Sequence, residues 1–136
     1  MTIFIIASFL FYSLNITGFK IGKFHLATSC LKDEPIDLVF YIPYAIGVVL
    51  FLIKPDIAAW ILLFLFVFIQ IIFYTSTYKY WLKPNLDKIR SYNAYFAETH
   101  HIIKAQENRL VPDTFHLSIF LMFWVNLFLI IFYLIS

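Results

Sequence analysis

Four long apolar runs, at residues 3–19, 36–53, 57–78 and 115–135, constrain this chain more than any other feature. At about 1.5 Å per residue in a helix, runs of this length cover most or all of the roughly 30 Å hydrocarbon core of a bilayer. A small soluble domain cannot bury that much apolar surface in a single core. We therefore predict an all-α integral membrane protein, a single domain with four transmembrane helices.

The composition also indicates lipid as the main solvent. The chain is 62% hydrophobic and 13% charged, whereas soluble domains have about 45–50% apolar and about 25% charged residues. The first run has no basic residue before it and is longer than the apolar part of a signal peptide, so we expect it to remain as the first span. The net charge of +2 gives no reason to expect nucleic acid as a partner.

Short polar segments separate the runs and predict where helices begin. Asp33-Glu34-Pro35 is typical of a helix start, with a capping acid followed by a proline in the first turn. Lys54-Pro55-Asp56 is so short that it can only join antiparallel neighbours, and Asp56 is the predicted cap of the third span. Pro43 lies inside the second span and is expected to kink it.

The only long polar segment, residues 79–114, lies between the third and fourth spans. Within it, apolar residues recur near helical spacing while charged residues fall mainly on other faces. This pattern predicts a cytoplasmic amphipathic segment of one or two helices on the membrane surface, with a solvated cap on the ends of the spans as the equal alternative. Aromatic residues on both sides of its start predict an interfacial belt. The apolar positions are Leu86, Ile89, Tyr92, Phe96, Ile103 and Leu110, and the belt residues are Tyr74, Tyr78, Tyr80 and Trp81.

Basic residues are distributed unevenly between the two sides that four spans define. Of the ten, nine lie in 20–35 and 79–113, and only Lys54 lies on the other side. By the positive-inside rule, segments 20–35 and 79–114 are predicted to be cytoplasmic and both termini outside, in a bacterial inner membrane, a plasma membrane or an organellar equivalent. The expected lipid- or partner-facing residues of the long segment are Lys79, Lys83, Lys88, Arg90, Lys104 and Arg109.

All four histidines fall on this same predicted side, together with acidic residues that can ligate metals. Imidazole and carboxylate groups are ligands that Zn and Fe accept. The spacing is unfavourable, because adjacent histidines of a helix point about 100° apart and no His-x-x-x-His or Cys-x-x-Cys pair is present. Helix capping, headgroup binding and burial are the simpler roles for these histidines. The candidate metal ligands are His25, His100, His101, His116, Glu98 and Asp113.

The spans hold almost no ionisable residue, which argues against an ion-coupled transporter. Gln70 and Asn126 are the polar residues nearest the middle of the membrane. Each is expected to hydrogen-bond across helices rather than to line a transport site.

These patterns favour a non-enzymatic subunit of a homo- or hetero-oligomeric membrane complex, with the bilayer and other membrane chains as its partners. The basic segment 79–113 is then the docking or lipid-headgroup surface. One alternative is a metal-dependent membrane enzyme with a His-rich site at the cytoplasmic rim. A second alternative is an oligomeric pore or transporter component, lined by Pro43, Gln70 and Asn126.

Overall fold

The chain folds into a mostly helical structure with one small β-hairpin. The structure, a computed structural model, describes residues 1–29, 31 and 38–136. The elements, in chain order, are α1 (Thr2–Thr17), β1 (Phe19–Ile21), β2 (Phe24–Ala27), α3 (Leu38–Ile53), α4 (Pro55–Phe73), the π-helical turn η2 (Tyr74–Tyr78), α5 (Lys79–Leu82), α6 (Leu86–Tyr95) and α7 (Thr114–Ile135).

Each of the four apolar runs forms a helix close to its predicted bounds. The third run continues from α4 through η2 and α5 as one helical segment of 28 residues, Pro55–Leu82, and α7 has 22 residues. These two are long and apolar enough to cross a membrane, whereas α1 and α3, with 16 residues each, are apolar but shorter. The helix start predicted at 33–35 lies outside the described residues.

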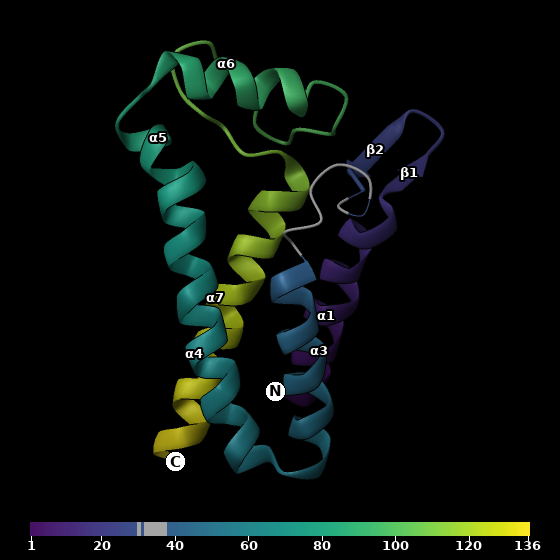
Figure 1. Cartoon of the computed structure of the whole chain (residues 1–136), viewed down its shortest axis with the longest axis vertical. Coiled ribbons are helices and arrows are strands. Elements are labelled where there is room, and N and C mark those ends of the chain that lie inside the picture. Colours follow the sequence, from purple (N-terminus) through teal and green to yellow (C-terminus); the bar gives the residue numbers. More distant parts are fainter. Residues whose placement is uncertain (30, 32–37) are drawn as a thin grey trace.

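The four long helices stand side by side, and the polar part of the chain lies across one end of them (Figure 1). We call residues 79–113 the cap. The β1–β2 hairpin lies beside the cap, whereas both termini and the turn between α3 and α4 lie towards the opposite end of the molecule. The hairpin and the cap therefore share one end of the bundle.

Aromatic side chains dominate the contacts inside the bundle. Tyr44 of α3 is fully buried and meets Phe66 of α4 and Phe123 of α7 edge-on, with ring centroids 5.2 and 5.6 Å away. Its hydroxyl donates to the carbonyl of Ile5 in α1 at 3.2 Å. Edge-to-face pairs add about 0.5–1.5 kcal/mol each to stability beyond their burial. Tyr44 alone thus connects all four long helices.

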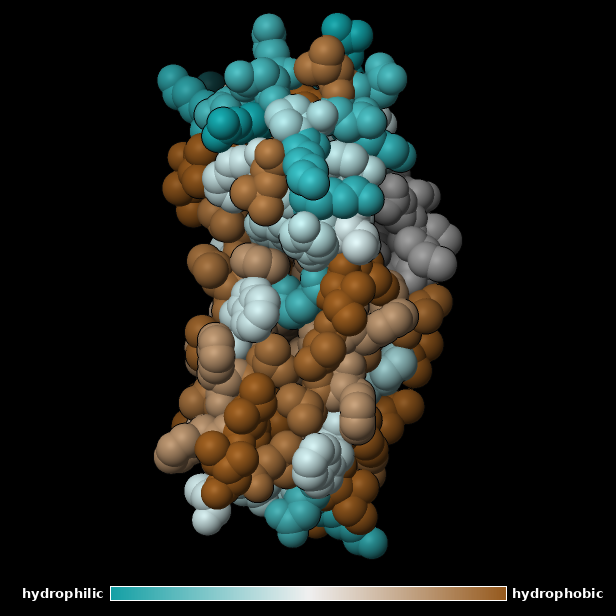
Figure 2. All heavy atoms as spheres, turned by 90° about the vertical axis from the view of Figure 1, so that its left-hand side faces the viewer, coloured by the Kyte–Doolittle hydropathy of each residue, from teal (hydrophilic) through white to brown (hydrophobic). Residues whose placement is uncertain are grey.

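The outer faces of the bundle are strongly apolar. Figure 2 shows hydrophobic side chains over most of the visible face, with hydrophilic ones gathered at the cap and a few at the opposite end. Ile3, Phe64 and Phe132 are 84%, 70% and 68% exposed. Soluble monomers rarely expose contiguous apolar patches larger than a few hundred Å². A surface of this kind needs lipid or another apolar surface to cover it.

Residues 19–27 form a β-hairpin, whereas the sequence indicated only a polar connection after the first apolar run. Its strands pair antiparallel around a two-residue loop, Gly22-Lys23. Gly22 has φ +57°, the positive value that the first loop residue of a type II′ turn requires. The backbone N–H of His100 donates to the carbonyl of His25 at 2.6 Å, and Lys20 lies 4.0 Å from Glu98. The hairpin is therefore bonded to the cap as well as to itself.

The cap is less helical than predicted. Its helices are the four-residue α5 and the ten-residue α6, which Asn85 caps by accepting a hydrogen bond from the Lys88 N–H at 3.1 Å. Residues 96–113 form no regular helix. Leu110 and Val111 are buried, so this stretch is held by packing beneath α6 rather than by a helical face of its own.

Asp56 does not cap α4, contrary to the prediction. The helix begins at Pro55, with Lys54 in the capping position and no side-chain cap. Asp56 lies in the first turn and accepts a hydrogen bond from the hydroxyl of Tyr133 at 2.6 Å. Because proline is favoured at the first helical position, it sets the start of α4 two residues earlier, at Pro55 instead of Ile57.

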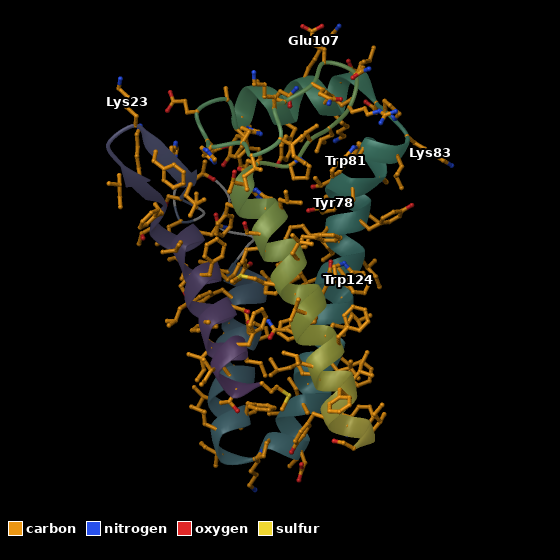
Figure 3. The ribbon with its side chains drawn as sticks, turned by 180° about the vertical axis from the view of Figure 1, so that it is seen from behind. Lys23, Tyr78, Trp81, Lys83, Glu107 and Trp124 are labelled. Carbon is orange, nitrogen blue, oxygen red and sulfur yellow. The ribbon has the colours of Figure 1, made fainter. Side chains whose placement is uncertain are left out.

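Tyr78 points inward instead of joining an exposed aromatic belt. It is 9% exposed, and its ring stacks on that of Phe120 in α7 at a centroid distance of 4.0 Å. Trp81 lies on the cap side of Tyr78, and Trp124 lies on the opposite side (Figure 3). Tyr78 is the last residue of the π-helical turn, and such turns change the direction in which side chains point.

Gln70 and Asn126, the polar residues expected near the middle of the membrane, differ in their bonding. The Gln70 side-chain amide donates to the Phe120 carbonyl across the α4–α7 interface at 3.2 Å. Asn126 is fully buried, and neither its Oδ1 nor its Nδ2 has a hydrogen-bond partner within the described part of the chain. An unsatisfied buried amide costs about 1–3 kcal/mol.

Replacing Asn126 with leucine, which has a similar branched shape, is expected to raise the free energy of unfolding by about 1–2 kcal/mol. Thermal unfolding in detergent micelles measures this gain. Asn108→Leu in the exposed cap is the matched control and should leave the midpoint unchanged. A lower midpoint for Asn126→Leu would show that the amide is bonded in the working protein.

Candidate functional site

A buried carboxylate–imidazole pair lies where the cap joins α7. Asp113 is the N-cap of α7, and its Oδ1 accepts a hydrogen bond from the backbone N–H of His116 at 2.8 Å. The same oxygen lies 2.7 Å from Nδ1 of the His116 ring. Only 1% of Asp113 is exposed. One carboxylate therefore both starts the helix and fixes the orientation of an imidazole.

The electrostatics of the pair favour the charged carboxylate. Burial alone would raise the pKa of Asp113, but hydrogen bonds and attraction from His116, with a smaller contribution from Thr99, outweigh it. The pKa of Asp113 is therefore held below its ordinary value of 3.8. Asp113 is ionised at neutral pH, and the ring nitrogen Nδ1 of His116 then donates to it.

Hydroxyl groups surround this pair on the cap side. The hydroxyl of Tyr92 in α6 accepts a hydrogen bond from the Asp113 N–H at 3.3 Å. Burial, followed by repulsion from Asp113, raises the pKa of Tyr92 well above its ordinary value, so its phenol stays protonated. The Thr114 hydroxyl accepts from the Ile102 N–H at 3.0 Å and lies 2.8 Å from Nδ1 of His100.

The remaining predicted ligands do not join the Asp113–His116 pair. His101 lies 3.2 Å from the carbonyl of Phe96, and Glu98 lies near Lys20 at the surface. His25 contributes its backbone carbonyl to the cap. Among the residues that the structure describes, no group of three or more His, Cys, Asp or Glu side chains is placed to hold a metal ion. A metal centre therefore stays a prediction.

The predicted basic residues lie on the outside of the cap. Lys79 is half-buried, with its ammonium 4.8 Å from the centre of the Tyr80 ring. The other five are exposed, and Figure 3 shows Lys83 pointing away from the bundle. These exposed residues are Lys83, Lys88, Arg90, Lys104 and Arg109.

A cavity of about 490 Å³ lies directly beneath the cap, and we call it the junction cavity. Small-molecule sites typically measure roughly 300–1,000 Å³. It is lined by α1, α3, α4, the π-helical turn, α6 and α7. His116 lines the cavity and is also the imidazole partner of Asp113. The lining residues that matter below are Asn15, Ile72, Ser76, Tyr92, His116 and Ile119.

Sequence reasoning missed most of this site. Asp113 and His116 were candidates as metal ligands, and their i, i+3 spacing at a helix start could have indicated a direct pair. Tyr92 was assigned only to an apolar face, and Ser76 to no role at all. No periodicity reveals a π-helical turn, although Thr75, Ser76 and Thr77 are an unusual polar cluster at the end of an apolar helix.

Comparisons with protein-family models, with curated proteins and with solved structures find no match to this chain.

Proposed function

We propose that this chain is a four-span integral membrane protein and a non-enzymatic subunit of an oligomeric membrane complex. The observation that carries the proposal is the distribution of polarity over the bundle. Apolar side chains cover the outer faces of all four long helices, and the charged side chains of the described residues lie at the two ends. Such a surface suits a bilayer, and it leaves wide apolar faces for contact with other membrane chains.

The two shorter helices belong to the membrane-embedded bundle in this proposal. At about 1.5 Å per residue, 16 residues span roughly 24 Å, which a thinned bilayer accommodates at modest cost. Ile5 of α1 and Val48 of α3 are buried against their neighbours, while Ile3 and Val49 face outward. An apolar helix with one face in the bundle and the other exposed is expected beside lipid.

The cap is the proposed docking surface and the cytoplasmic side. Nine of the ten basic residues occur in segments 20–35 and 79–113. The hairpin and the cap are at one end, with the termini towards the other, so the positive-inside rule assigns both termini to the outer side. Exposed Lys88 and Arg90 on α6 are available to an acidic partner surface or to anionic headgroups.

The mass of the purified protein in nanodiscs tests the proposal. We expect a discrete assembly larger than one 16.1 kDa chain. The double variant Lys88→Glu with Arg90→Glu should release a cap-bound partner, because it reverses two charges on one exposed helix. Lys54→Glu at the opposite end is the control and should leave the assembly intact. A monodisperse single chain for the wild type would contradict the proposal.

The metal-dependent membrane enzyme is a second candidate because the Asp113–His116 pair supplies two adjacent ligand-type groups. Carboxylate–imidazole pairs also orient ligands around metals. Elemental analysis of protein purified without chelators distinguishes the two candidates. One metal ion per chain, lost in His116→Ala, would favour the enzyme over the subunit.

A further inference from the structure

We propose that the junction cavity binds a neutral amphiphile that has one apolar chain and a head group able to accept hydrogen bonds. The inference rests on the membrane insertion proposed above but not on the subunit role. Its basis is the chemistry of the lining, which changes from apolar to polar along the depth of the cavity.

The deep part of the cavity is apolar. Ile69, Ile72 and Phe73 line it from α4, and Ile119 lines it from α7. Ile69 is eight residues before Thr77, which at about 1.5 Å per residue corresponds to roughly 12 Å along the helix. This wall offers no hydrogen bond through its side chains, so it suits a hydrocarbon chain that enters from the bilayer.

The part nearest the cap carries the hydrogen-bonding side chains of the lining, beside the rings of Phe96 and Phe115. Ser76 and Thr77 of the π-helical turn, Asn15 of α1 and Tyr92 of α6 line it, together with the ring of His116. The Tyr92 oxygen accepts from the Asp113 N–H, so its own hydrogen is directed to another acceptor. The raised pKa of Tyr92 keeps that hydrogen in place at neutral pH. A carbonyl or ether oxygen in the head group supplies such an acceptor.

The lack of acidic and basic side chains in the lining disfavours the binding of charged head groups. No Lys, Arg, Asp or Glu occurs among the described residues that line this cavity. The nearest carboxylate, Asp113, is already paired with His116 at 2.7 Å. Lys88 lines a separate and smaller hollow of about 200 Å³ on the far side of Tyr92 and Phe96. A full charge placed in the junction cavity would lose its hydration without gaining a partner.

Native mass spectrometry of the full chain in detergent, with three ligands of identical chain length, tests the inference. The probes are 1-monomyristoylglycerol with a neutral head, myristate with an anionic head and tetradecyltrimethylammonium with a cationic head. We expect saturable binding of one monomyristoylglycerol per chain, at least about tenfold tighter than either charged probe. The same spectra give the oligomeric mass, so failure of the subunit proposal is seen separately from failure of this one.

Two variants and two matched controls locate the binding. Tyr92→Phe removes only the hydroxyl and should weaken binding of the neutral probe about 3- to 10-fold, the usual range for one hydrogen bond. Ile72→Trp fills the cavity and should abolish binding. Tyr80→Phe and Ile46→Trp make the same changes outside the cavity and should bind as the wild type does.

Three results would overturn the inference. Equal retention of all three probes by every variant would show unspecific partitioning. Preference for a charged probe would show that the head group is not neutral. Loss of binding in Tyr80→Phe or Ile46→Trp as large as in the cavity variants would place the ligand elsewhere.

Discussion

Asp113→Ala lowers the free energy of unfolding by about 3 kcal/mol, which is the largest effect that we expect from any carboxylate in the described part of the chain. The substitution removes the N-cap of α7, a loss of typically about 1 kcal/mol. It also breaks a buried pair and leaves the His116 ring without its carboxylate, which costs up to roughly 3–5 kcal/mol where burial is complete. His116 is partly exposed, so the broken pair costs less than that upper range, and we expect about 3 kcal/mol for both losses together.

Denaturant unfolding in micelles, followed by circular dichroism, measures this loss. Asp87→Ala is the matched control, because Asp87 is exposed in the first turn of α6 and should change stability by less than about 0.5 kcal/mol. Asp113→Asn separates the two contributions, since asparagine is a good N-cap but carries no charge. An Asp113→Ala protein as stable as the wild type would contradict the role of the pair.

The Asp113 contribution has a defined dependence on pH. Its pKa in the folded protein lies below the ordinary 3.8, so folding favours the ionised form. The resulting stability is complete above about pH 4 and is lost as the pH falls through the lower, folded value. The stability difference between the wild type and Asp113→Asn should therefore shrink as the pH falls below about 4.

Gly47→Val is expected to destabilise the protein by about 2–3 kcal/mol through overpacking between α3 and α4. A Cβ atom at position 47 would lie 2.5 Å from Cδ2 of Leu62 and 3.1 Å from its Cγ. Leu62 is fully buried, so moving its side chain aside would displace the neighbours packed against it. Gly47 is a position where α3 and α4 approach closely.

A double-mutant cycle checks this explanation. Leu62→Ala makes room beside position 47, so Gly47→Val should cost clearly less in that background, which gives a coupling energy of about 1 kcal/mol or more. Ala7→Val adds two of the same three carbon atoms at an exposed position of α1 and should be nearly neutral. Equal costs of Gly47→Val in both backgrounds would mean that Leu62 is not the obstacle.

The helices could be predicted from the sequence because apolar length determines them locally. Residues 57–78 and 115–135 were predicted within a few residues of the observed helices, and the apolar faces follow directly. The β-hairpin could not be predicted in the same way, because its seven strand residues are held partly by the cap through His25 and His100. The near-helical spacing of apolar residues in 79–114 predicts one or two helices, or a solvated cap, yet residues 96–113 form no regular helix, and tertiary packing buries Leu110 and Val111 without one.

The candidate site depends even more on contacts between distant segments. Asp113 and His116 are three residues apart, and this i, i+3 spacing at a helix start could have predicted their pairing. The junction cavity, by contrast, joins residues from α1 to α7 that no periodicity relates. The polar part of the cavity could not be predicted either, because Tyr92 and Ser76 line it only through contacts between distant segments.

The π-helical turn at Tyr74–Tyr78 has a consequence for how this protein can evolve. Such a turn holds one residue more than an α-helical turn, so the residues after it are rotated by roughly 100° relative to an uninterrupted helix. Substitutions on the α7-facing side of α4 are thereby uncoupled from those that orient Tyr78 and the cap. Deleting one residue between Tyr74 and Tyr78 would convert the turn to regular α-helix. Every later side chain of the helix would then rotate away from its present neighbour. Single-residue insertions and deletions at that turn should therefore be tolerated poorly, whereas single substitutions on the outer apolar faces of the bundle should be tolerated well.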